Sequence, residues 1–222
     1  MRPVTLRVTC LLIATVAAIT ACDAARRTRS DLDPPNTFTA ARVQHVGPSL
    51  NVLAYLATGS LGNDQVGEHP IGKGVLRSSG DLTVTFDIVH PADTRPLAEL
   101  FSDDASLSAP NARFASVPLI AFGRPVERSV VAGSSLGAVT GHGTDPGDVT
   151  AVFMYVDRDV TVTDHIEVGG DAIGFRVSLE EGWNLVLIHT AESPSGAVYK
   201  YLAVGEPDEV NWYSVPGFVT FY

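Results

Sequence analysis

The sequence predicts an all-β protein, a single-domain antiparallel β-sandwich with one short helix, and three observations support this prediction. Short apolar runs recur along the chain, and clusters of Gly, Pro and Asp separate them. With 222 residues, of which 45% are hydrophobic and 18% charged, the chain can form a substantial core. Its two cysteines, Cys10 and Cys22, both precede the predicted domain, so no disulfide can stabilise that domain. Several short strands in a domain of this size are typical of a sandwich.

The clearest predicted strand covers residues 81–89, where apolar and polar residues alternate as in a strand with one buried face. The run Val149–Val156 is apolar at almost every position, which predicts a central strand with two buried faces. Turn residues separate three runs near the C-terminus and predict a three-stranded meander. These runs cover residues 175–179, 183–189 and 197–204. The other predicted strands cover residues 49–57, 74–77 and 117–122, with 218–222 at an edge.

Only the segment 92–101 has a helical pattern. Asp93 is a suitable N-cap, and Leu97, Leu100 and Phe101 would form a small apolar face. This segment is therefore the one predicted helix.

The N-terminal segment has the composition of an export signal. Two arginines precede an apolar run at residues 11–19, which is shorter than a membrane-spanning helix. The run ends in Ile19-Thr20-Ala21-Cys22. This tetrapeptide resembles the lipobox of bacterial lipoprotein precursors. The resemblance implies that residues 1–21 are a signal peptide and that Cys22 becomes the lipidated N-terminus, carrying acyl chains such as palmitate. An ordinary secretory cleavage and an uncleaved membrane anchor remain the alternatives.

Residues 22–37 are expected to form the lipidated cysteine and a flexible tether, and residues 38–222 the β-sandwich domain. The tether is polar, contains Asp33-Pro34-Pro35-Asn36 and has no hydrophobic period. Its three arginines (26, 27 and 29) either contact anionic lipid head groups or are simply solvated. The resemblance implies a lipid-anchored location on the extracytoplasmic face of the cell membrane. Asp23 resembles the inner-membrane retention signal of enterobacterial lipoproteins, so the choice between inner and outer membrane depends on the source.

The G-x-S-x-G pattern of the α/β-hydrolase nucleophile elbow occurs at Gly133-Ser134-Ser135-Leu136-Gly137. The elbow requires a strand before the serine and a helix after it. Residues 128–132 could form the strand, but the glycines that follow disfavour a helix. We therefore expect a flexible loop around Ser135 rather than a catalytic serine.

Oxygen-bearing side chains gather in the loop Gly141–Asp148 and at Asp157, Asp159, Asp164 and Glu167, but their spacing fits no EF-hand pattern. Turn-forming aspartates are the favoured interpretation, and whether the loop Gly141–Asp148 binds an ion stays open. The adjacent carboxylates at 103–104 and 180–181 are expected to solvate turns. The histidines have no metal-ligand spacing, so no metal and no cofactor are predicted. They stand at positions 45, 69, 90, 142, 165 and 189, and His189 shares the register of a predicted strand's apolar residues.

Aromatic residues near the C-terminus allow two interpretations. Tyr199 and Tyr201 share one strand face, and Trp212 and Tyr213 follow in the next segment. They could line a partner surface, but core filling is favoured. The stretch Leu179–Asn184 resembles strand turns in transthyretin-like and carboxypeptidase-regulatory-like sandwiches.

The function expected from these features is that of a non-catalytic binding or assembly module of the cell envelope, not an enzyme. Its expected partners are the lipid bilayer, through Cys22, and an envelope protein. A net charge of −10 excludes nucleic acid, because an acidic surface repels phosphate groups. A small-molecule or metal carrier and an envelope hydrolase are the alternatives.

Overall fold

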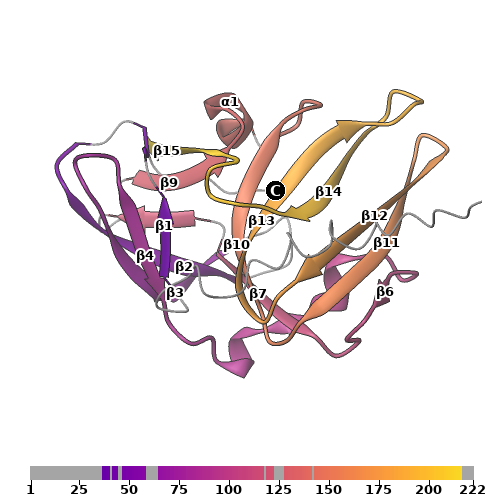
Figure 1. Cartoon of the computed structure of the whole chain (residues 1–222), viewed down its shortest axis with the longest axis horizontal. Coiled ribbons are helices and arrows are strands. Elements are labelled where there is room, and N and C mark those ends of the chain that lie inside the picture. The colour runs from indigo at the N-terminus through magenta and orange to yellow at the C-terminus, as the bar shows by residue number, and fades with distance from the viewer. Residues whose placement is uncertain are drawn as a thin grey trace, which may run out of the picture. The chain divides into compact units, whose positions relative to one another are not determined.

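The computed structural model describes residues 37–40, 42–44, 47–58, 65–117, 119–122, 128–141 and 143–216. The chain divides into two units, Met1–Pro35 and Asn36–Tyr222, and the described residues all belong to the second. The lipobox with Cys22, the tether up to residue 36 and the predicted edge strand at 218–222 lie outside the described residues. The second unit is an antiparallel all-β sandwich, as predicted, and its described residues contain one short α-helix (Figure 1).

Within the described residues, twelve strands form one sheet and three form another. The main path of the large sheet runs β1-β4-β3-β2-β8-β9-β10-β13-β14, with β15 paired to β9, β7 to β10 and β5 to β7. The small sheet runs β12-β11-β6. The strands of the large sheet are β1 (Thr37–Ala40), β2 (Leu50–Thr58), β3 (Gln65–Leu76), β4 (Leu82–Phe86), β5 (Arg95–Pro96), β7 (Arg113–Val117), β8 (Leu119–Phe122), β9 (Arg128–Gly133), β10 (Val149–Val156), β13 (Gly182–Glu192), β14 (Val198–Val204) and β15 (Asn211–Pro216). Those of the small sheet are β6 (Ser106–Leu107), β11 (Val160–Val168) and β12 (Asp171–Leu179).

Strand β10 occupies the residues predicted for the central strand and is central. It pairs with β13 along one edge, while β7 and β9 share the other edge. Because successive side chains of a strand point to opposite faces, its continuous apolar run serves two cores. Ala151 and Phe153 belong to one buried cluster, and Val152, Met154 and Val156 belong to another.

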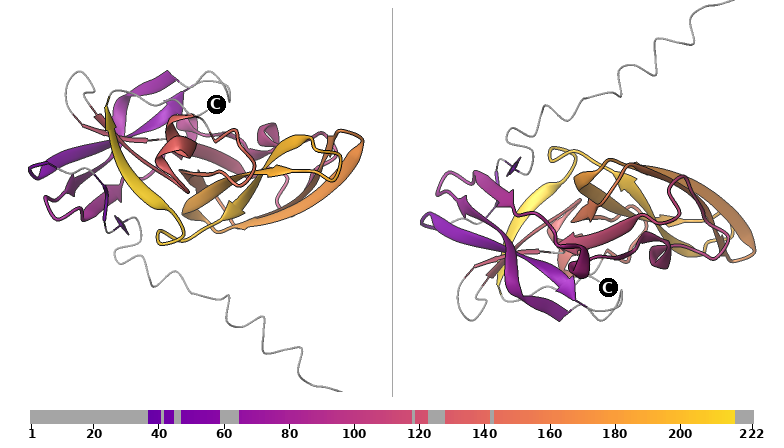
Figure 2. Two further views of the ribbon diagram at one scale, coloured as in Figure 1. Left: turned by 90° about the horizontal axis from the view of Figure 1, so that it is seen from above. Right: turned by 90° about the horizontal axis from the view of Figure 1, so that it is seen from below.

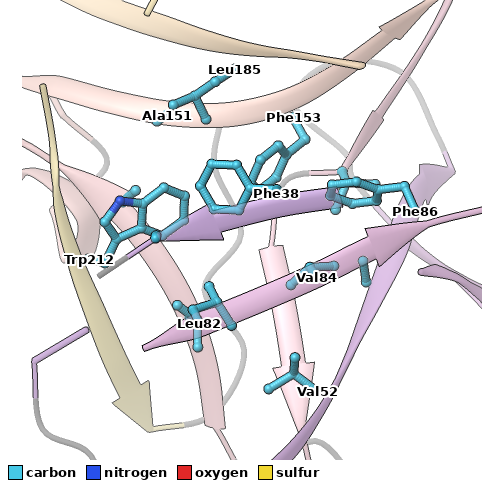
Figure 3. Close-up of a cluster of buried hydrophobic side chains, with 14 of the residues drawn as sticks. Phe38, Val52, Leu82, Val84, Phe86, Ala151, Phe153, Leu185 and Trp212 are labelled. Atoms are coloured by element: carbon cyan, nitrogen blue, oxygen red, sulfur yellow. The ribbon is translucent and has the colours of Figure 1, made fainter. Parts of the chain in front are cut away.

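The first core is rich in aromatic rings (Figure 3). The ring of Phe153 lies 4.6 Å from that of Phe38 on β1 and 5.0 Å from that of Phe86 on β4, centroid to centroid. Trp212 on β15 lies 5.0 Å from Phe38, and its indole N–H donates to the Pro207 carbonyl. The strand nearest the N-terminal end of the described chain is therefore packed into the middle of this core.

The second core lies between the β7-β10-β13 part of the large sheet and the small sheet. Its fully buried members include Phe114 of β7, Val156 of β10 and Val162 of β11, each at most 1% exposed. In Figures 1 and 2 the hairpins β11–β12 and β13–β14 project together at the end of the sandwich away from β1–β4. The two hairpin tips are joined, since the Asp171 carboxylate accepts from the backbone N–H of Ser195 at 2.9 Å.

The predicted helix at 92–101 is wrong. The segment forms two 3₁₀ turns, Pro91–Asp93 and Leu97–Leu100, with β5 between them. Pro96 provides the physical reason, because its ring removes a backbone donor and disfavours helical geometry in the residue before it. Asp93 is not the cap, since the Nδ1 atom of His90 accepts from the Ala92 N–H at 3.2 Å. The α-helix is α1 (Leu136–Thr140), in a segment predicted as a loop.

The predicted C-terminal meander is correct only for β13 and β14. Strand β12 pairs with β11 in the small sheet, whereas β13 pairs with β10 in the large one, so the turn at Glu180–Glu181 crosses between sheets. The hairpin β11–β12 closes through Gly169 and Gly170, with φ of +60° and +87°. Two consecutive positive φ values match the right-handed twist of the flanking strands. Strand β12 therefore pairs with β11 along its whole length and does not pair with β13.

Candidate functional site

Ser135 lies between a strand and a helix, but its side chain has a structural role. Strand β9 ends at Gly133, and α1 begins at Leu136, so the flexible loop expected here is wrong. The Ser135 Oγ accepts a hydrogen bond from the Ala138 N–H at 3.0 Å, which caps the first turn of α1. Because α1 is five residues long and has a glycine at its second position, this cap contributes much of its stability.

The loop that follows is held by its own backbone and by β13. The Asp148 carboxylate accepts from the Asp145 N–H at 3.1 Å, and Gly147 adopts a φ of +93°. Thr190 of β13 exchanges two backbone hydrogen bonds with Gly147 and Asp148, each 2.8 Å long. These aspartates form a turn, as the favoured interpretation predicted.

Two of the other predicted oxygen ligands, Asp157 and Asp159, serve separate backbone groups. Asp157 accepts from the Arg113 N–H and pairs with Arg158 at 3.0 Å, while Asp159 accepts from the Glu181 N–H. Across the described residues, no group of three or more His, Cys, Asp or Glu side chains is arranged to hold a metal ion.

Asp164 is the most deeply buried carboxylate of this set, at 7% exposure. Burial alone raises its pKa, but hydrogen bonds from the Ser102 hydroxyl and from the backbone N–H groups of Ser102 and His165 outweigh burial. The pKa of Asp164 therefore lies below its usual value. This carboxylate fastens the 101–105 turn to β11, which is a structural role.

The predicted carboxylate pairs and histidines are dispersed. Residues 103–104 and 180–181 are exposed in turns, as expected. His90 caps a 3₁₀ turn, His165 is exposed and His189 is partly buried on β13. The positions of His45 and His142, and the side chain of His69, lie outside the part of the chain that is described.

The four aromatic residues singled out by the sequence divide into two pairs. Trp212 and Tyr213 are 4% and 6% exposed and fill two core clusters, as favoured. Tyr199 and Tyr201 are only partly buried and lie in none of the core clusters, so core filling is wrong for them. Beside them on the neighbouring strand, His189 is the register partner of Tyr201.

His189, Tyr199 and Tyr201 together form a surface that we call the aromatic ledge. The His189 and Tyr201 rings stack 4.9 Å apart and within 9° of parallel, and the Tyr199 ring follows at 6.1 Å. No hydrogen bond links either tyrosine hydroxyl or the imidazole to any described residue. The ledge is thus a row of three partly exposed rings whose polar atoms can still bind a ligand.

Comparison with known proteins gives no relative for this arrangement. No family model, curated protein or solved structure matches this chain. The described residues also contain no helix with the length and hydrophobicity needed to cross a bilayer.

Proposed function

We propose that this protein is a lipid-anchored lipoprotein on the extracytoplasmic face of the cell membrane, and that it acts as a non-catalytic binding or assembly module of the cell envelope. The observation that carries the anchoring is Ile19-Thr20-Ala21-Cys22, placed directly after a short apolar run preceded by two arginines. Lipid on Cys22 would hold the sandwich at the bilayer through residues 22–37. Two or more acyl chains give stable anchoring, whereas one does not.

The binding role is supported by what the polar side chains do. The oxygen of Ser135 caps a helix, and Asp145, Asp157 and Asp164 belong to turns or hold backbone N–H groups. The aromatic ledge differs from these because its polar atoms have no partner among the described residues. Tyrosine is enriched at protein interfaces, since its ring is rigid and its hydroxyl forms hydrogen bonds.

Lipidation is tested by expressing the full-length chain in bacteria fed an alkyne analogue of palmitate. The chain offers a matched control, because Cys10 and Cys22 are its only cysteines. The wild type and Cys10→Ala should carry the label and sediment with membranes, and Cys22→Ala should do neither. Label that persists in Cys22→Ala, or a wild type without label, would refute the anchoring.

The binding role is tested by cross-linking and affinity capture from native membranes with the wild type and Cys22→Ala. A stoichiometric protein partner that is captured only with the anchored wild type would support an assembly module. A membrane-bound wild type that captures no protein would count against it.

A further inference from the structure

The aromatic ledge is flanked by acidic segments on two sides. On the β10 side, the turn containing Asp145 and Asp148 is hydrogen-bonded to Thr190, the residue after His189. Two residues before His189 on β13, Leu187 lies on the same strand face as the ledge. The segment that follows β14 covers Leu187. Gly205 of that segment is so close that an added Cβ would lie 2.3 Å from the Leu187 side chain. Three carboxylates follow it, at Glu206, Asp208 and Glu209, and each residue is exposed.

The nearest cation within the hairpin does not offset this charge on the ledge. Lys200 lies between the two tyrosines in sequence, and strand alternation therefore places it on the opposite face of β14. The rings therefore have acidic segments on both sides along the sheet. The rings present negative π density, and the carboxylates add negative potential around them.

We propose that the aromatic ledge docks an extended, arginine-bearing segment of a partner protein, an inference that rests on the binding role proposed above and specifies its partner. A guanidinium group is planar, always charged, and carries five N–H donors with no acceptor. The tyrosine hydroxyls can accept from these donors, and the outer face of Tyr199 offers a stacking surface. The flanking carboxylates attract the cation before contact and orient it.

Charge also decides against two other occupants. A second copy of this chain would bring the same carboxylates to the ledge, and like charges brought together cost affinity. A phosphate-bearing ligand would be repelled for the same reason. The backbone of an extended cationic segment places every second side chain on one face, which suits Tyr199 and Tyr201 on one face of β14.

The test measures binding of a fluorescein-labelled peptide of alternating arginine and threonine to the full-length chain in detergent, by fluorescence anisotropy. A lysine-for-arginine peptide has the same charge but cannot stack as a planar group. Three variants are compared with the wild type. They are the ring variant Tyr199→Leu/Tyr201→Leu, the acid variant Glu206→Gln/Asp208→Asn/Glu209→Gln, and the distant acid control Glu99→Gln/Asp103→Asn/Asp104→Asn.

The wild type should bind the arginine peptide more tightly than the lysine peptide. The ring variant and the acid variant should each raise Kd by about tenfold, as expected for removal of a hot spot. The acids of this control belong to the 97–105 segment, which is fastened to β11 of the small sheet and not to β13 or β14. The control should therefore change Kd by less than about twofold, since salt screens exposed charges that do not contact the peptide. The variant Tyr199→Phe/Tyr201→Phe keeps the rings and removes only the hydroxyls, so it should lose less affinity for the arginine peptide than the ring variant. It therefore separates the contribution of the hydroxyls from that of the rings.

Several results would overturn the inference. If the two peptides bound equally well, stacking of the guanidinium group would have no role. If the distant acid control raised Kd as much as the acid variant does, binding would depend only on the net charge of the protein. Absence of wild-type binding would refute the cationic partner, while membrane labelling and partner capture would still report separately on the proposed function. If the ring variant bound like the wild type, the ledge would not be the site.

Discussion

Replacing Phe38 by alanine tests whether β1 is an integral part of the first core. The Phe38 side chain is 6% exposed, and its ring contacts those of Phe153 at 4.6 Å and Trp212 at 5.0 Å. Phe→Ala substitutions in cores cost about 3–5 kcal/mol, which combines lost transfer energy with the cavity left behind. The two ring contacts keep Phe38→Ala away from the lower end of that range, so we expect a loss of about 4 kcal/mol.

This loss can be measured without unfolding the variant at room temperature. Domains of this size have total stabilities of about 5–15 kcal/mol, so most of the variant should remain folded. At about 2–4 °C per kcal/mol, Tm should fall by roughly 8–16 °C. Guanidinium unfolding followed by tryptophan fluorescence is a direct assay, because Trp212 lies against the substituted ring.

The matched control is Ile88→Ala. The Ile88 side chain is 85% exposed, so its removal should change stability by less than about 0.5 kcal/mol. A loss below about 1 kcal/mol for Phe38→Ala would refute a core position for this ring, since buried phenylalanines cost several times more. An equal loss in both variants would show that the assay does not report on this core.

Three further predictions follow from other parts of the described chain. Ser135→Ala should lower the free energy of unfolding by about 1 kcal/mol in thermal unfolding, because the helix cap is lost. A fluorophosphonate should not label Ser135 in the wild type. Labelling there would contradict the non-catalytic proposal. Gly169→Ala should destabilise the protein more than Gly170→Ala. Both glycines have positive φ, but only at Gly169 would an added Cβ collide, at 2.3 Å from the Ser195 hydroxyl. Equal Tm values for the two variants would argue against packing between the hairpin tips. Asp164→Asn should cost about 1–3 kcal/mol near neutral pH through weakened hydrogen bonds to a charged acceptor. Because folding lowers the pKa of Asp164, its contribution to stability is present above the unfolded pKa of about 4 and is lost as pH falls through the folded pKa. The gap in free energy of unfolding between wild type and Asp164→Asn should therefore narrow below about pH 4, and a constant gap across that range would refute it.

Features that depend on local pattern were predictable from the sequence. The run Val149–Val156 matches β10 residue for residue, because an uninterrupted apolar strand requires a core on each face. The alternation around Leu82–Phe86 likewise marks β4. Aspartates in turns were expected for the reason observed, since their carboxylates accept from nearby backbone N–H groups.

Features that depend on distant pairing were not predictable in the same way. The turn at Glu180–Glu181 has ordinary hairpin residues, yet β12 and β13 enter different sheets because β11 and β10 provide their partners. One local signal was missed, namely Gly169-Gly170, whose two-residue spacing is typical of a tight hairpin. The ledge could not be inferred from Tyr199 and Tyr201 alone. Whether such rings are buried depends on which layer covers that face of β14.

The position of the aromatic ledge follows from unequal strand lengths. Strand β13 has eleven residues and β10 has eight, and their pairing ends at Val149 and His189. Beyond this point β13 pairs with β14, and on its other edge, among the described residues, only Thr190 bonds to the turn containing Asp145 and Asp148. The last part of the hairpin therefore extends past the cores that β10 organises. The ledge is therefore held in place by strand hydrogen bonds and ring stacking, not by core packing. Substituting its tyrosines should cost little stability, so a change in peptide binding can be separated from a change in folding.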